Sequence, residues 1–168
     1  MVLISKQVLG ASAPSVTFSS IPQVFNHLRV TYVGRSDFAG TVTNIRMTFN
    51  GDTGANYDQC IVDGVNSATT AATSNGITSF QFAGLLVGTS IATFPSSGLY
   101  DILNYTNTTF YKTATGQSDT ASTSPASTYT RNFYGNWRST AAITSVSLLA
   151  QTGDNLTTGS IFYLYGIY

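Results

Sequence analysis

The sequence contains no glutamate, only two lysines (Lys6 and Lys112) and few charged residues of any kind. Charged side chains make up 8% of the 168 residues, against roughly 25% in an average soluble domain. Seven cations balance seven aspartates, so the net charge is zero and no basic surface for nucleic acid or an anionic membrane is indicated. Because Glu and Lys are common surface residues of helices, their scarcity argues against a helical protein.

Cysteine and histidine each occur once, as Cys60 and His27. One cysteine excludes a disulfide within the chain and, with one histidine, excludes a His/Cys metal site. We interpret Cys60 as a small buried hydrophobic residue and His27 as a half-exposed strand residue. The sequence also lacks the apolar run of about 18 residues that a membrane-spanning helix needs. Its start lacks the basic segment of a secretory signal peptide.

Apolar residues alternate with polar ones in many short segments, which is the pattern of half-buried β-strands. Clusters of Gly, Asn and Asp separate these segments and indicate turns. The expected strands are 2–9, 15–18, 27–32, 44–49, 80–82, 100–105, 110–114, 128–134, 142–149 and 161–168. We therefore predict an all-β fold: a single antiparallel, jelly-roll-like β-sandwich of about 8–10 strands with little or no helix.

The length indicates one domain, which we place at residues 14–168. Residues 1–13 are either its first strand or an N-terminal arm that adds a strand to a neighbour's sheet edge. The residues of such an arm are Val2, Leu3 and Ile4. Residues 115–127 (TGQSDTASTSPAS) are polar and of low complexity, so we expect a long exposed loop there. Residues 67–73 are expected to form a loop or one helical turn.

The residue types give little support for catalysis. His27 is the only histidine that could activate a nucleophile, and no Gly-x-Ser-x-Gly elbow is present. Carboxylate pairs of the glycosidase type are available, but most of these aspartates lie beside Gly or Asn, as turn residues do. The aspartates concerned are Asp52, Asp58, Asp63 and Asp101. We therefore predict a protein that is not an enzyme and uses no cofactor.

Residues 50–58 (NGDTGANYD) carry oxygen-bearing side chains at alternate positions, as calcium-binding loops do. The bidentate acid that such a loop requires is missing, because Ile61 stands at its place. A structured turn is the favoured interpretation, in which an Asn-Gly pair supplies a tight turn and Asp52 and Asn56 cap backbone amides.

Aromatic residues gather in the second half of the chain and have two interpretations. They form a platform on which sugar rings stack, or they fill the core, because strands favour Phe and Tyr. The residues are Tyr105, Phe110, Tyr111, Tyr129, Phe133, Tyr134 and Trp137. The scarcity of charge favours association, since charged residues are depleted and Tyr is enriched at interface cores. We therefore expect a homo-oligomer or a larger assembly.

Seven short sequence motifs, which we call phrases, stand in this order within residues 14–168: VTFSSIPQ at 16–23, GRSD at 34–37, FNGDTGANY at 49–57, DILNYTNT at 101–108, KT at 112–113, GNWRSTAAIT at 135–144 and GSIFYLYGI at 159–167. Together they resemble a β-rich family of virion proteins of tailed bacteriophages, described as capsid decoration (cement) proteins and fibre-associated domains. The resemblance implies that such residues hold the fold, and it carries over no catalytic residue.

The residues of these phrases also have roles that physical chemistry suggests directly. Those assigned to the structured turn are Asn50, Asp52 and Tyr57. Asp101 is expected to pair with Lys112 or Arg138 across neighbouring strands. Trp137 is expected to fill the core, and Gly166 to let a backbone approach the last strand closely.

Two functions fit a domain of this size in that family. The first is a homotrimeric cement protein that is made in the host cytoplasm and binds the major capsid protein on the outside of the head. Because it binds only the assembled shell, it stabilises the joints between subunits by mass action. The second is a tail or fibre component that binds host-surface carbohydrate. Length favours the first, because a fibre protein usually carries a long trimerising shaft.

Overall fold

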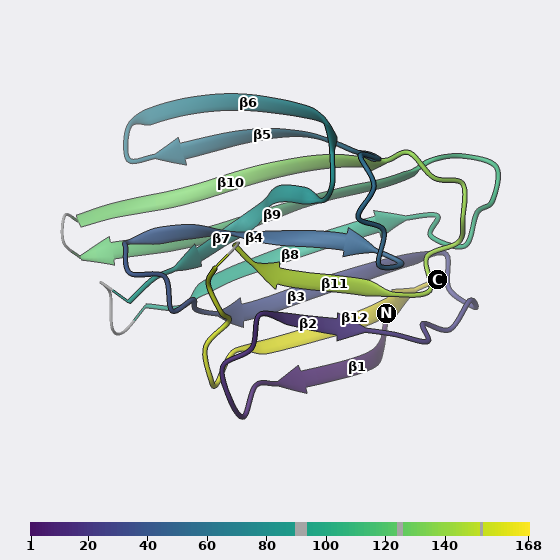
Figure 1. The fold of residues 1–168 in the computed structure, drawn as a ribbon, viewed down its shortest axis with the longest axis horizontal. Coiled ribbons are helices and arrows are strands. Elements are labelled where there is room, and N and C mark those ends of the chain that lie inside the picture. The colour runs from purple at the N-terminus through teal and green to yellow at the C-terminus, as the bar shows by residue number, and fades with distance from the viewer. Residues whose placement is uncertain (90–93, 124–125, 152) are drawn as a thin grey trace.

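The computed structural model describes residues 1–89, 94–123, 126–151 and 153–168, and this part of the chain is all β. Its twelve strands form two antiparallel sheets that pack as a β-sandwich (Figure 1). The large sheet has the order β1 (Val2–Val8), β12 (Ile161–Ile167), β3 (His27–Gly34), β8 (Ser96–Leu103), β9 (Lys112–Thr123), β10 (Ala126–Trp137), β5 (Tyr57–Val65) and β6 (Ala68–Ile77). The small sheet has the order β2 (Ser15–Phe18), β11 (Val146–Ala150), β4 (Val42–Phe49) and β7 (Phe80–Val87).

The predicted all-β sandwich is therefore confirmed, and the core shows why the alternation revealed it. Every second residue of the facing strands points between the sheets, as Leu28 and Val30 do on β3 and Ile45 and Met47 do on β4. Jelly-roll connectivity stays a prediction, because the strand order in the eight-stranded and four-stranded sheets does not establish it. No helix among the described residues is long and apolar enough to cross a membrane.

The edge of β7 that does not pair with β4 faces the large sheet, and side chains of that sheet satisfy its backbone. Three buried or half-buried N–H groups of β7 donate to side-chain oxygens of the large sheet. The pairs, donor first, are Phe82 with Gln59 (3.3 Å), Leu85 with Ser118 (3.1 Å) and Val87 with Ser96 (2.7 Å). Because buried N–H groups need acceptors, these three polar side chains must point into the core.

The predicted loop at 115–127 is wrong, because these residues belong to β9 and β10, which pair along their length. The side chains of β9 alternate, and its buried residues are Lys112, Ala114, Gly116, Ser118 and Thr120. A Cβ on Gly116 would lie 2.3 Å from the ring of Tyr100, so only glycine fits there. The low complexity of this segment thus reflects the small side chains that β9 buries in the core. Residues 124–125 lie outside the described residues.

The β5–β6 hairpin is the other major difference from the predicted strands. Residues 67–73 fall almost entirely in β6, where neither a loop nor a helical turn occurs, and β5 was not predicted at all. β6 is exposed on both faces, so its sequence shows no apolar alternation. The strand predicted at 142–149 begins only at Val146, and the one predicted at 110–114 begins at Lys112.

Residues 1–13 contribute the first strand of the chain's own sheet. β1 pairs antiparallel with β12, from Val2 opposite Gly166 to Val8 opposite Ile161. The candidate arm residues Val2 and Leu3 are exposed and Ile4 is half-buried. Of the two interpretations of this segment, the first strand is therefore the one that the structure adopts.

Two single-residue predictions also need correction. Cys60 is half-buried on the side of β5 that faces away from the core, so it is not a buried core residue. Gly166 makes room for a ring and not for a backbone: a Cβ there would lie 2.3 Å from Phe25. The predicted half-exposed His27 is confirmed, and its Nδ1 accepts the N–H of Asn104 at 3.0 Å.

Replacing Ser118 tests the strand assignment directly. Ser118→Ala leaves the buried N–H of Leu85 without its acceptor, so we expect the free energy of unfolding to fall by about 1–3 kcal/mol. Urea unfolding measures this loss. The matched control is Ser67→Ala in an exposed turn, for which we expect a change within about 0.5 kcal/mol. Equal, small effects of both substitutions would contradict the buried position of Ser118.

Candidate binding face

The face of the large sheet that points away from the small sheet carries exposed apolar side chains on β3, β8, β10 and β5, with β9 lying between β8 and β10. We call it the outer face. Its residues alternate with core residues, as Leu99 and Asp101 alternate with the buried Tyr100 and Ile102. Large apolar side chains on this face are between 37% and 51% exposed: Val33, Val62, Leu99, Leu103 and Tyr134. Clustered apolar exposure of this kind is typical of interaction surfaces.

Two adjoining hollows lie in the outer face. One of about 410 Å³ crosses β5, β10, β9 and β8, and its lining includes Cys60, Tyr134, Thr115 and Asp101. The second, of about 360 Å³, crosses β10, β9, β8 and β3. Leu99 and Gln117 line both, so Leu99 lies at the centre of one shallow, continuous depression. Gln117 donates to Asn132 in its floor at 3.0 Å.

Two of the charges at this depression are paired with each other, and a third, Asp119, lines the second hollow and accepts from the Ser97 hydroxyl. Arg29 on β3 makes a two-pronged ion pair with Asp101 on β8, both contacts being 2.7 Å. Asp101 was expected to pair with Lys112 or Arg138, and that prediction is wrong. Arg138 lies 3.4 Å from Asp58. Their pairing makes Arg29 and Asp101 cheaper to dehydrate than isolated ions would be.

Lys112 lies inside the fold and not on a charged surface. Its ammonium group donates to the carbonyls of Phe110 and Thr140 at 3.0 and 3.1 Å. Its side chain is fully buried, and burial lowers its pKa. Lys112 therefore ties the start of β9 to the segment after β10.

The aromatic residues divide between the two interpretations. Tyr105, Phe133 and Trp137 belong to the core, so a sugar platform built from the whole set is wrong. Tyr134 remains on the outer face. Phe110 and Tyr111 are exposed just before β9, and Tyr129 is half-buried.

The predicted turn at residues 50–57 forms, and its parts hold several segments together. Asn50 and Gly51 both have positive φ, and the N–H of Asp52 donates to the carbonyl of Phe49, as in a type I′ turn. The Asn50 side chain reaches across to the segment before β11. Its contacts are the carbonyl of Ala142, the N–H and hydroxyl of Thr144 and the N–H of Ser145.

Asp52 and Tyr57 bind this turn to the core. The carboxylate of Asp52 accepts from the Trp137 indole (2.7 Å), the Asn56 amide (2.9 Å) and the Gly54 N–H (2.7 Å). Burial raises the pKa of Asp52, but these donors outweigh it and hold the pKa below its ordinary value. The buried hydroxyl of Tyr57 accepts the N–H of Phe49 at 3.0 Å. Trp137 is in the core, as predicted.

These donors also bear on the calcium alternative. Both oxygens of Asp52 already accept hydrogen bonds from N–H groups, which occupy the lone pairs that a cation would use. Within the described ranges, no group of three or more His, Cys, Asp or Glu side chains lies close enough to hold a metal ion. Asp52 caps the Gly54 N–H as the turn interpretation predicts, whereas the Asn56 amide donates to Asp52 instead of capping a backbone amide.

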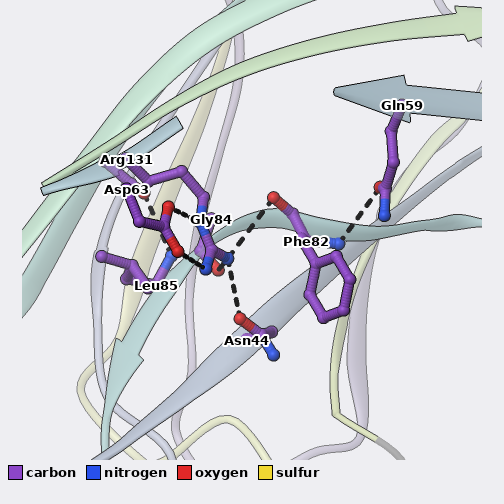
Figure 2. Close-up of polar contacts among 8 residues, drawn as sticks. Asn44, Gln59, Asp63, Phe82, Gly84, Leu85 and Arg131 are labelled. Atoms are coloured by element: carbon purple, nitrogen blue, oxygen red, sulfur yellow. Dashed lines mark hydrogen bonds and ion pairs between the residues drawn. The ribbon is translucent and has the colours of Figure 1, made fainter. Parts of the chain in front are cut away.

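Arg131 is the most informative polar residue that the sequence did not reveal. It is 5% exposed and points from β10 towards the small sheet. Its guanidinium makes a two-pronged ion pair with Asp63 on β5 at 2.6 Å and donates to Asn44 on β4 at 2.7 Å. Figure 2 shows the same group reaching the carbonyls of Phe82 and Gly84 on β7. One side chain thus joins four strands across the sandwich.

A signal for Arg131 was present in the alternation. Arg131, Phe133, Gly135 and Trp137 share one parity on β10, and the two aromatics are core residues. A cation in that parity is buried unless the strand bends, and a buried cation requires a carboxylate partner. The sequence does not show which aspartate supplies it, because β5 was not predicted.

The chain matches no protein-family model, and a search of curated proteins gives no match.

Removing Arg131 is expected to destabilise the protein far more than removing Arg29. Arg131→Ala leaves Asp63 half-buried without its cation, at a cost of about 3–5 kcal/mol. Arg29 and Asp101 are about a quarter to a third exposed, so Arg29→Ala costs about 0–1 kcal/mol. Urea unfolding compares the two. If Arg131→Ala does not fold, the double variant Arg131→Met with Asp63→Leu should restore folding. If neither Arg131→Ala nor the double variant folds, this account of the ion pair is wrong.

Asp52 is expected to contribute to the acid sensitivity of the fold. Its folded pKa lies below the unfolded value of about 3.9, so its contribution is present above that pH and is lost as the pH falls through the folded pKa. Asp52→Asn should lower the free energy of unfolding at neutral pH and reduce the further loss on acidification. Urea unfolding at several pH values measures both. Asp37, whose pKa is also lowered, contributes equally to the acid sensitivity of both proteins. If the free energy of unfolding falls as steeply with pH in the variant as in wild type, Asp52 does not have this role.

Proposed function

We propose that this protein is a non-enzymatic structural component of a tailed-phage virion, a capsid decoration (cement) protein that docks on the assembled head through its outer face. The observation that carries the proposal is the outer face itself. It presents exposed apolar side chains, among them Leu99 and Val33, interspersed with uncharged polar groups, and the nearby charges of Arg29 and Asp101 neutralise each other. Such a face is suited to burial against protein.

The resemblance of the seven phrases to virion proteins supplies the identity of the partner, which is the major capsid protein. The phrases also coincide with structural residues of this fold. FNGDTGANY contains the structured turn at residues 50–57, GNWRSTAAIT contains Trp137, and GSIFYLYGI runs along β12. A family that shares these phrases is therefore expected to share the sandwich. In this proposal the protein is made in the host cytoplasm and ends on the capsid exterior.

The mechanism of stabilisation is thermodynamic. A protein that binds the assembled shell and not the separate subunits lowers the free energy of the shell by an amount set by its concentration and affinity. The outer face suits this task because it is preformed on regular strands, so little chain is ordered on binding. The cement proposal includes a homotrimer on the shell, which the resemblance to virion proteins implies.

A tail or fibre component that binds carbohydrate is the second candidate, and one observation favours it. Tyr134 lies beside polar groups in the larger hollow, where a sugar ring would find an aromatic face and hydrogen-bonding partners. Those partners are Asp101, Thr115, Gln117 and Asn132.

The test places a charge at the centre of the outer face. Leu99→Asp should weaken binding to purified heads by about tenfold or more, because a buried unpaired charge opposes docking. Val24→Asp is the control, since Val24 is 67% exposed and lies outside the outer face, in the segment before β3. Co-sedimentation with heads that lack the protein measures binding. Undiminished binding of Leu99→Asp would contradict docking through this face.

Copy number and glycan binding separate the two candidates. Hundreds of copies in each virion, counted by quantitative mass spectrometry, support the cement protein, whereas tens or fewer support the tail or fibre component. Binding on a glycan array that Tyr134→Ala abolishes would favour the second candidate, and an array without hits would count against it.

A further inference from the structure

Four strands lie at the edges of the two sheets: β1, β6, β2 and β7. Unpaired N–H and C=O groups at an edge invite another strand, so proteins usually protect them. The edge of β7 is satisfied by side chains of the large sheet, as described above. β2 has only four residues, and the carbonyl of Thr17 accepts from Gln7. β1 carries Lys6 and a β-bulge between Leu3 and Ser5.

β6 has fewer of these protections, since its register irregularity against β5 lies near its end, between Ser74 and Ile77. Its ten residues (ATTAATSNGI) include no charge and no proline, and most side chains are exposed on both faces. It pairs regularly with β5 from Ala68 to Ser74, and no described strand pairs with its other edge. In Figure 1, β5 and β6 form the margin of the large sheet beyond β7 and β4. A long, neutral edge that is regular from Ala68 to Ser74 therefore faces outwards.

We propose that β6 pairs antiparallel with β6 of a second copy of this chain, so that two large sheets become one continuous sheet. Identical antiparallel strands are self-complementary about a two-fold axis, and such a contact closes after two copies. Pairing β6 with β1 of another copy would instead bring in Lys6 and the bulge, features that oppose edge pairing. A second copy of β6 is the matching edge that this chain itself supplies.

The register follows from the regular part of the strand. The midpoint of Ala68–Ser74 is Ala71, so a two-fold axis there sets Thr69 opposite Thr73 and Thr70 opposite Ala72. These side chains are small and uncharged, and Thr–Thr pairs across strands are favourable. With the axis perpendicular to the sheet, both outer faces lie on the same side of the joined sheet.

This inference does not rest on the proposed function and differs from three-fold association. It concerns the free chain in solution, and its interface leaves the outer face uncovered. If the chain forms dimers but does not bind heads, this inference stands and the cement proposal fails. If it binds heads but stays monomeric in solution, the cement proposal stands and this inference fails.

The experiment measures the mass of the full chain in solution over a range of concentrations by analytical ultracentrifugation. We expect wild type at twice the 17.8 kDa mass of the chain. Ala71→Lys places two lysines opposite each other at the axis and should weaken the dimer by about tenfold or more. The control Val8→Lys puts the same charge on the opposite edge, at an exposed position, and should leave the dimer intact.

Charge rescue adds a second readout. Ala71→Asp alone should also be monomeric, whereas an equal mixture of Ala71→Lys and Ala71→Asp should form dimers, because opposite charges then face each other across the axis. Circular dichroism spectra that match wild type would show that the exposed substitutions leave the fold unchanged. The proposal is overturned if wild type is a monomer or a trimer, if Ala71→Lys dimerises as well as wild type, or if the mixture stays monomeric.

Discussion

The backbone of β7 imposes the constraint on which the rest of the sandwich depends. Its edge is buried against the large sheet, and no described strand pairs with it; at the end of β7 the N–H of Ser36 donates to the carbonyl of Val87, but its other N–H and C=O groups need different partners. Side chains must therefore satisfy these groups. Five strands supply them: Gln59 from β5, Ser96 from β8, Ser118 from β9, Tyr32 from β3 and Arg131 from β10. The two sheets are joined by these hydrogen bonds as well as by apolar packing.

That constraint explains residues that would otherwise look misplaced in a core. Ser118 is polar because Leu85 needs an acceptor, and Gly116 is small because the ring of Tyr100 occupies the adjacent space. Arg131 brings a charge inside, so Asp63 must accompany it. A chain with few charges thus uses one of its ion pairs between the sheets and a second, Arg29 with Asp101, on the outer face.

How much of this the sequence predicts depends on which face of a strand is covered. Strands with one buried apolar face, such as β3 and β4, are evident from alternation alone. β6 is exposed on both faces and β9 buries small or polar residues, so neither shows an apolar period. The turn around Asp52 was predictable because Asn-Gly chemistry is local. The partners of Asp101 and Arg131 were not, because they depend on strand order, which lies outside local sequence.

The unequal width of the two sheets connects the fold to association. Four strands cannot cover eight, so β6 at one margin is exposed on both faces, while the outer face has no covering layer among the described strands. Proteins usually give such surfaces lysine and glutamate, which keep them monomeric. This chain has two lysines and no glutamate, and on its outer face the apolar residues stand among uncharged side chains, the Arg29–Asp101 pair and Asp119. The low charge of these exposed surfaces is the physical basis of the proposal that the protein is a component of an assembly.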